Sequence, residues 1–149
     1  MFTINYEISI NRSPEETFRY VSDSRNDATW CPPVLEVNQV KGSSPELRAK
    51  YTFITKPGPK KTEGAFEIVD FKPNIRAAYK GENGIAHFNY HYEFSSGDNA
   101  TKLRMTSTVA PKGLWKLLQP VMRSATKKVT KEEFDNLKRL LEDQQHGNA

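Results

Sequence analysis

Hydrophobic and polar side chains alternate along the first segment of the chain. Residues 2–11 place Ile4, Tyr6, Ile8 and Ile10 on one face and Thr3, Asn5, Glu7 and Ser9 on the other. A period of two is typical of a β-strand with one buried face. The sequence therefore predicts a half-buried strand at this end of the chain.

A helix-start signal follows this strand. Ser13 can cap a helix, Pro14 suits its first position, and Glu16 can complete a capping box. Residues 23–30 predict a second helical turn or short helix, which Pro32 and Pro33 end. Two short helices are therefore expected after the first strand.

The middle of the chain, from about residue 35 to residue 110, has the pattern of an antiparallel sheet. Turn-forming residues cluster at 42–45, 56–61, 73–74, 81–84 and 95–99, with no helical period between them. The clearest strand places Ala86, Phe88, Tyr90, Tyr92 and Phe94 on one face. Over 64–72 the register is ambiguous, because Phe66/Ile68 and Val69/Phe71 point to opposite faces. Seven strands are predicted in all.

Residues 111–144 show helical spacing instead. A first apolar stripe contains Leu114, Leu117, Leu118, Val121, Met122, Ala125 and Val129, and a second, rotated stripe contains Phe134, Leu137, Leu140 and Leu141. Pro120 lies inside the first stripe and predicts a kink or a fresh helix start. The two halves are expected to pack on different parts of the protein.

These elements predict an α+β fold in which one long C-terminal helix covers an antiparallel sheet. A length of 149 residues is typical of one domain, expected over 1–145, with a flexible tail over 146–149. One helix seldom covers a whole curved sheet closely. An interior cavity is therefore expected between the two.

Composition narrows the function classes. The net charge of +4 comes from basic residues spread along the chain, apart from clusters at 56–61 and 127–128, which a solvated loop and a solvated helix face explain. No nucleic-acid partner is predicted. Neither a membrane-length apolar run nor a signal-peptide core is present, so no integral membrane segment and a cytoplasmic location are expected. The single Cys31 excludes an internal disulfide and a cysteine-based metal site; no cofactor or metal is expected.

Several short motifs resemble a known superfamily in their order and spacing. They are residues 13–18 (SPEETF), 20–23 (YVSD), 30–34 (WCPPV), 67–73 (EIVDFKP), 101–103 (TKL) and 137–142 (LKRLLE). Over nearly its whole length the chain resembles the START/polyketide-cyclase superfamily, and most closely its small polyketide cyclase/dehydrase-like members. The resemblance implies a helix-grip fold, a seven-stranded sheet curled around the C-terminal helix with two short helices after the first strand. It also implies a cavity for an apolar or amphipathic molecule.

The inward faces of the predicted strands supply the candidate binding site. The residues expected to contact a ligand are Trp30, Tyr51, Phe53, Tyr79, Phe88, Tyr90, Tyr92, Met105, Leu118 and Met122. Apart from tyrosine, no titratable side chain is assigned to this surface, and tyrosine is a poor base near neutral pH. The catalytic residues, if any exist, are unknown from sequence. This inventory favours binding over acid–base chemistry.

Individual residues leave alternatives open. His87 and His91 could share a metal ion, but they lie on the polar face of their strand, which favours exposed histidines. Trp30 could gate the cavity or anchor the second helix, and Cys31 could be a nucleophile or an inert thiol. Tyr90 and Tyr92 could bind a ligand or simply pack. Glu67 or Asp70 could enter the cavity, which would favour an enzyme.

Three functions are compatible with these observations. The leading hypothesis is a protein, monomeric or weakly dimeric, that binds a hydrophobic or aromatic, lipid- or polyketide-like small molecule. The alternative is a polyketide cyclase, aromatase or dehydratase that uses the same cavity to orient its substrate. The third is an interaction protein that docks a macromolecule through its basic patches.

Overall fold

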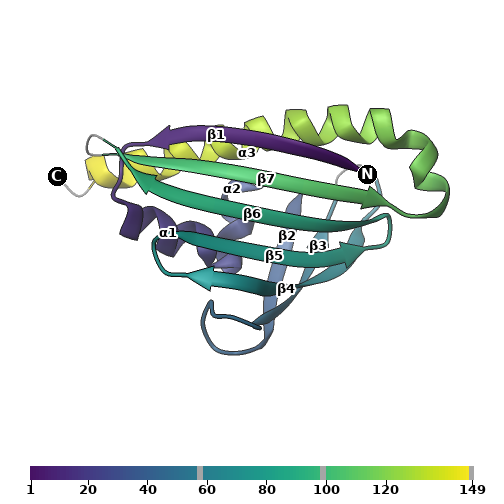
Figure 1. Ribbon diagram of the computed structural model, residues 1–149, viewed down its shortest axis with the longest axis horizontal. Helices are drawn as coiled ribbons and strands as arrows, with labels where there is room; N and C mark the ends of the chain where they lie inside the picture. The colour runs from purple at the N-terminus through teal and green to yellow at the C-terminus, as the bar shows by residue number, and fades with distance from the viewer. Residues whose placement is uncertain (57–58, 98–99, 148–149) are drawn as a thin grey trace.

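The computed structural model describes residues 1–56, 59–97 and 100–147. Its strands are β1 (Phe2–Ile10), β2 (Val34–Lys41), β3 (Lys50–Thr55), β4 (Thr62–Lys72), β5 (Arg76–Asn83), β6 (Ala86–Ser96) and β7 (Thr101–Pro111). They form one antiparallel sheet in the order β1-β7-β6-β5-β4-β3-β2. Figure 1 shows this sheet curling, with α3 (Gln119–Gly147) lying along its β1 edge. The predicted α+β helix-grip fold is confirmed.

Short helices connect β1 to β2, as the sequence predicts. α1 (Pro14–Ser22) begins after Ser13, whose hydroxyl accepts a hydrogen bond from the backbone N–H of Glu16 at 3.2 Å. A 3₁₀ turn, η1 (Ser24–Asn26), and the one-turn helix α2 (Asp27–Trp30) follow. These elements close one end of the space enclosed by the sheet.

A β-bulge resolves the ambiguous register of β4. The pairing with β5 shifts between Ile68 and Asp70, so that Val69 is an extra residue on its strand. Phe66, Ile68 and Phe71 can therefore all pack on the inner side, while Val69 is left exposed. Because the bulge adds one residue, a strict period of two fails along this strand. The sequence pattern therefore assigns the pairs Phe66/Ile68 and Val69/Phe71 to opposite faces.

The C-terminal helix begins anew at the predicted proline. The 3₁₀ helix η2 (Gly113–Leu118) leaves the end of β7, and α3 then starts with Pro120 in its first turn. In the second half of α3, Phe134, Leu137 and Leu141 are 1 %, 0 % and 1 % exposed. In the first half, no side chain before Thr130 is fully buried. The helix is therefore packed firmly on the sheet at only one end.

The structure describes part of the tail that the sequence predicts over residues 146–149. α3 includes residues 146 and 147 of the predicted tail, and residues 148–149 of that tail lie outside the described residues.

Across the described parts of the chain, no helix combines the length and the apolar character needed to cross a membrane.

Gly81 allows the close approach of β4 and β5 that the curled sheet requires. A Cβ atom at this position would lie 2.3 Å from the carbonyl oxygen of Ala65 and 2.5 Å from the Cβ of Phe66. At Gly84, in the turn that follows, a Cβ would meet only a methyl group of Thr62, at 3.9 Å. Of these two glycines, only Gly81 is required by packing.

We expect Gly81→Ala to lower the free energy of unfolding by about 2 kcal/mol, because backbone atoms must move to admit the methyl group. Gly84→Ala is the matched control and should be neutral or slightly stabilising. Urea denaturation of both variants measures the difference. Equal stabilities would show that β4 and β5 accept a Cβ atom at position 81 without a cost in stability.

Candidate functional site

A cavity of about 330 Å³ lies between the inner face of the sheet and the first half of α3. It exists because α3 packs tightly only beyond Thr130, while its first half stands away from the strands. The volume is at the lower end of the range of roughly 300–1,000 Å³ that is typical of small-molecule sites. The helix-grip arrangement therefore creates a space large enough for a ligand.

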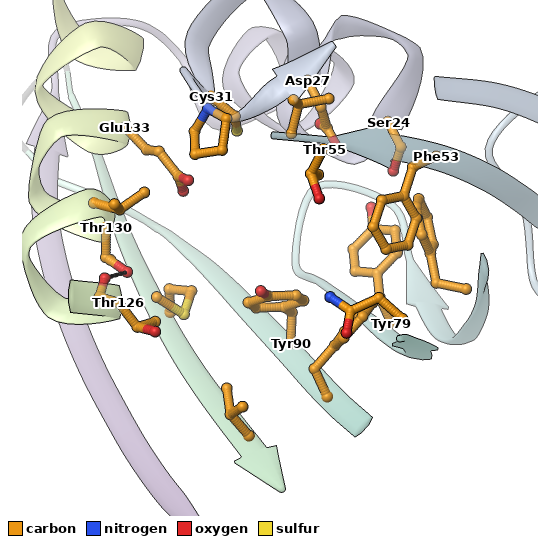
Figure 2. A pocket seen from close by; sticks show the side chains of 18 of the residues that line it. Ser24, Asp27, Cys31, Phe53, Thr55, Tyr79, Tyr90, Thr126, Thr130 and Glu133 are labelled. Atoms are coloured by element: carbon orange, nitrogen blue, oxygen red, sulfur yellow. Dashed lines mark hydrogen bonds between the residues drawn. The ribbon is translucent and has the colours of Figure 1, made fainter. Parts of the chain in front are cut away.

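Seven of the ten predicted site residues line this cavity. They are Phe53, Tyr79, Phe88, Tyr90, Tyr92, Met105 and Met122. Their strands alternate as predicted, and inward-facing residues of β3, β5, β6 and β7 converge on the same space. Figure 2 shows Phe53, Tyr79 and Tyr90 among them. Their contact with a ligand stays a prediction.

The other three predicted residues do not line the cavity. Trp30 is 3 % exposed and packs on Phe134, with ring centroids 5.8 Å apart, so it anchors α2 to α3. Tyr51 is fully buried behind Phe66, whose ring stacks on it at 4.9 Å and forms the cavity wall in its place. Leu118 is 46 % exposed, because η2 carries it beyond the end of the sheet.

The cavity is lined by two carboxylic acids that the sequence pattern did not identify as site residues. Asp27 comes from α2 and Glu133 from α3, and Figure 2 shows both directed into the same space, with Tyr90 opposite. A signal for Glu133 was present. It continues the cavity-facing row Met122, Ala125/Thr126 and Val129 at spacings of three and four. The charged neighbours Lys131, Glu132 and Asp135 concealed this row in the sequence.

The environment of the two acids favours their protonated forms. Burial, with a smaller contribution from the neighbouring Glu132, raises the pKa of Glu133 from 4.5 to about 7. Burial and the nearby charges of Glu133 and Asp23 raise the pKa of Asp27 well above its ordinary value. Among the described residues that line the cavity, none is Lys, Arg or His. The site therefore contains carboxyls that can donate a hydrogen bond near neutral pH.

The other polar groups of the cavity suit binding. The hydroxyl of Tyr79 donates to the backbone oxygen of Ser22 at 2.8 Å and is thus committed to the fold. Burial raises the pKa of both Tyr90 and Tyr92, so these phenols stay protonated and can only exchange hydrogen bonds. Burial also raises the pKa of Cys31, which lines the cavity as a thiol and not as a thiolate.

The remaining candidates lie outside the cavity. Asp70 pairs with Arg76 at 2.6 Å on the surface, and Glu67 alternates with the inward-facing Phe66 and Ile68. Neither acid enters the cavity. On the outer face, His87 is exposed and lies 3.2 Å from Glu82, while His91 is half-buried and lies 3.9 Å from Glu93. Within the described residues, no three potential metal-binding side chains come together.

The family of the chain agrees with this architecture. Residues 1–142 match the family described as "Polyketide cyclase / dehydrase and lipid transport". The chain belongs to this family, which supports a ligand-binding helix-grip fold and leaves the ligand open. A comparison with curated proteins found no match.

Solved structures with the same fold share little sequence with this chain. The protein TTHA0849 from Thermus thermophilus superposes with a TM-score of 0.80 at 16 % identity, covering 93 % of this chain and 95 % of its own. The Zhui aromatase/cyclase from Streptomyces sp. R1128 gives 0.83 at 10 % identity, covering 95 % and 93 %. A conserved protein from Geobacillus kaustophilus gives 0.76 at 17 %, covering 94 % and 95 %. At these identities the likeness establishes the fold alone.

The raised pKa of Glu133 predicts how stability depends on pH. Between pH 4.5 and about 7 the folded protein holds a proton on Glu133 that the unfolded chain releases, so the free energy of unfolding should fall as pH rises. The fall due to this group is up to about 3 kcal/mol and should be complete above pH 7. Glu133→Gln should remove this part, and denaturant titrations across the pH range measure it.

The exposed neighbour provides the control. Glu132→Gln changes charge equally but leaves the buried carboxyl in place, so it should retain most of the fall. If both variants behave like the wild type, Glu133 does not titrate near neutral pH in the folded protein.

Proposed function

We propose that this protein binds a neutral hydrophobic or aromatic small molecule, lipid- or polyketide-like, in the cavity between the sheet and α3. The main support for this proposal is a cavity of about 330 Å³ whose walls are mainly apolar and aromatic. Its polar groups are gathered beside α2 and α3 (Figure 2). A mainly apolar wall with a few convergent polar groups is the usual composition of a small-molecule site.

The charges around the cavity support a neutral ligand. An anionic ligand would meet Asp27 and Glu133 and no compensating cation among the described lining residues. A ligand hydroxyl or carbonyl could instead accept a hydrogen bond from a protonated carboxyl or from the phenol of Tyr90 or Tyr92. The apolar body of the ligand would then lie against Phe53, Phe88 and other wall residues.

Filling the cavity should abolish binding. Ala86 is 4 % exposed and faces the cavity, so the ring of Ala86→Phe would occupy part of the empty volume. Native mass spectrometry of the freshly purified wild type should show a bound small molecule, and the variant should lose it. Unfolding temperature gives a second readout, because saturating a site at about 100 times the dissociation constant adds roughly 3 kcal/mol.

The control for this experiment is on the outer face of the sheet. Ala78→Phe adds the same ring on β5, at a position that does not line the cavity, and should leave binding unchanged. If neutral aromatic compounds, sterols and lipids all fail to stabilise the wild type, and nothing copurifies, the binding proposal is refuted.

A second function is favoured by one specific observation. Glu133 combines a position in the cavity with a pKa of about 7, a value suited to general acid–base catalysis at neutral pH. We therefore retain a cyclase, aromatase or dehydratase as the alternative. In it the cavity would pre-fold a polyketide-like chain, while Glu133 would exchange a proton with an enolisable carbonyl and Tyr90 would orient the oxygen.

The alternative predicts a pH-dependent rate. Turnover of a poly-β-ketone thioester should follow one ionisation near pH 7, and Glu133→Gln should reduce kcat by about 100-fold or more, while binding of the cyclised product changes little. Glu132→Gln should keep both the rate and the pH profile. Undetectable turnover in the wild type, with product binding intact, would favour the carrier over the enzyme.

A further inference from the structure

An apolar surface that the sequence predicts to be buried is exposed in the structure. The residues of this surface, called here the η2 patch, are Leu114, Trp115, Leu117, Leu118 and Val121, with exposed fractions of 83 %, 42 %, 80 %, 46 % and 67 %. Four of these residues, all except Trp115, begin the first apolar stripe of the predicted C-terminal helix, which the sequence predicts to pack against the protein. η2 leaves the end of β7 and carries the first four beyond the strands, and Val121 follows in the first turn of α3 (Figure 1).

The local geometry makes the patch continuous. In a 3₁₀ helix, residues three apart lie above one another, so Leu114 aligns with Leu117 and Trp115 with Leu118. The two rows are adjacent, and Val121 extends the second row into α3. A contiguous exposed group of large apolar side chains is typical of a surface that contacts a partner or a membrane, whereas apolar residues exposed singly are normal.

The segment that contains the patch is rich in positive charge. From Lys112 to Lys128 the chain contains five Lys or Arg residues and no acid. Lys112 is engaged by Glu82 at 2.9 Å. Lys116 occupies the third row of η2, beside the apolar rows, and Lys128 follows Val121 by seven residues and so lies on the same edge of α3.

We propose that the η2 patch docks on an anionic lipid bilayer. The apolar side chains would enter the interface between headgroups and acyl chains, Trp115 would take the interfacial position that tryptophan favours, and the flanking cations would pair with lipid phosphates. No segment needs to span the membrane for this mode of attachment.

The charges argue against a second copy as the occupant. A symmetric dimer through this surface would bring the same patch of each copy together, and with it Lys116 against the cations of its partner. Such juxtaposition of like charges is unfavourable at an interface. An anionic bilayer supplies both an apolar interior and the opposite charge.

The patch also adjoins the cavity. Met122 lines the cavity immediately after Val121, and the cavity reaches Asn83 and Ile85 at the β5–β6 turn. The backbone N–H of Lys112, at the start of η2, donates to the carbonyl oxygen of Ile85 at 2.8 Å, so patch and cavity meet at this end of the sheet. Docking would place the cavity wall next to the lipid. The docking proposal itself does not depend on what the cavity binds.

Vesicle binding by the full chain tests the proposal. We expect cosedimentation with phosphatidylcholine vesicles that contain phosphatidylglycerol, weak binding to pure phosphatidylcholine, and loss of binding at high salt. Tryptophan emission should shift to the blue, and Trp115→Phe should remove the shift because Trp30 is already buried. The double variant Leu114→Ser/Leu117→Ser should weaken binding by at least about tenfold.

Matched controls separate the patch from general effects. Val40 and Leu47 are comparably exposed apolar residues elsewhere, so Val40→Ser/Leu47→Ser should bind vesicles as the wild type does. Lys116→Gln/Lys128→Gln should weaken binding by about tenfold, whereas Lys60→Gln/Lys61→Gln should not. Circular dichroism confirms that each variant is folded.

Three results would overturn the proposal. The first is no binding of the wild type to anionic vesicles at low salt. The second is equal loss of binding in the patch and control variants. The third is a stable dimer, measured by light scattering, that Leu114→Ser/Leu117→Ser dissociates while vesicles are not bound, which would assign the patch to a second copy.

Discussion

The structure depends on the packing of α3 at one end only. Phe134, Leu137 and Leu141 are buried against the sheet, and Tyr6 stacks on Phe134 with ring centroids 5.2 Å apart. The side chain of Arg12 also donates to the carbonyl oxygen of Leu141 at 2.8 Å, which ties the end of the helix to the chain that follows β1. Because this half carries the apolar contacts, the first half need not contact the sheet closely, and the space beneath it stays open.

This arrangement determines the electrostatics of the cavity. Side chains from α3, as far along as Glu133 at its middle, meet those of α2 over the open space, and among them are two carboxyls. Because both carboxyls are partly withdrawn from water and no described lining residue is a cation, the protonated form of each is favoured. The basic residues that the structure describes lie away from the cavity wall, so a protein of net charge +4 encloses an interior that disfavours anions. Binding and proton transfer are both compatible with this interior.

The same separation of the two halves explains the outer surface of the helix region. The first apolar stripe of the C-terminal segment, over residues 114–129, is divided between two environments. In a helix packed closely on the sheet, the whole stripe would cover the strands. Met122 and Val129 face the cavity, while η2 turns Leu114 and Leu117 toward solvent beside a run of cations. One short segment thus borders both the candidate ligand site and the candidate lipid surface. A ligand that is sparingly soluble in water would have a short path between them.

Local patterns in the sequence determined the strands, the two short helices, the proline at the start of α3 and the inward face of β6, because each follows from the period or capping of neighbouring residues. The tertiary structure decided the features that depend on contacts between residues distant in the sequence. The bulge at Val69 depends on pairing with β5, and the exposure of Leu118 depends on where η2 leaves the sheet. Asp27 and Glu133 look like ordinary surface acids on amphipathic helices. They become interior groups only because two elements distant in the sequence enclose a common space, and burial is a property of that enclosure.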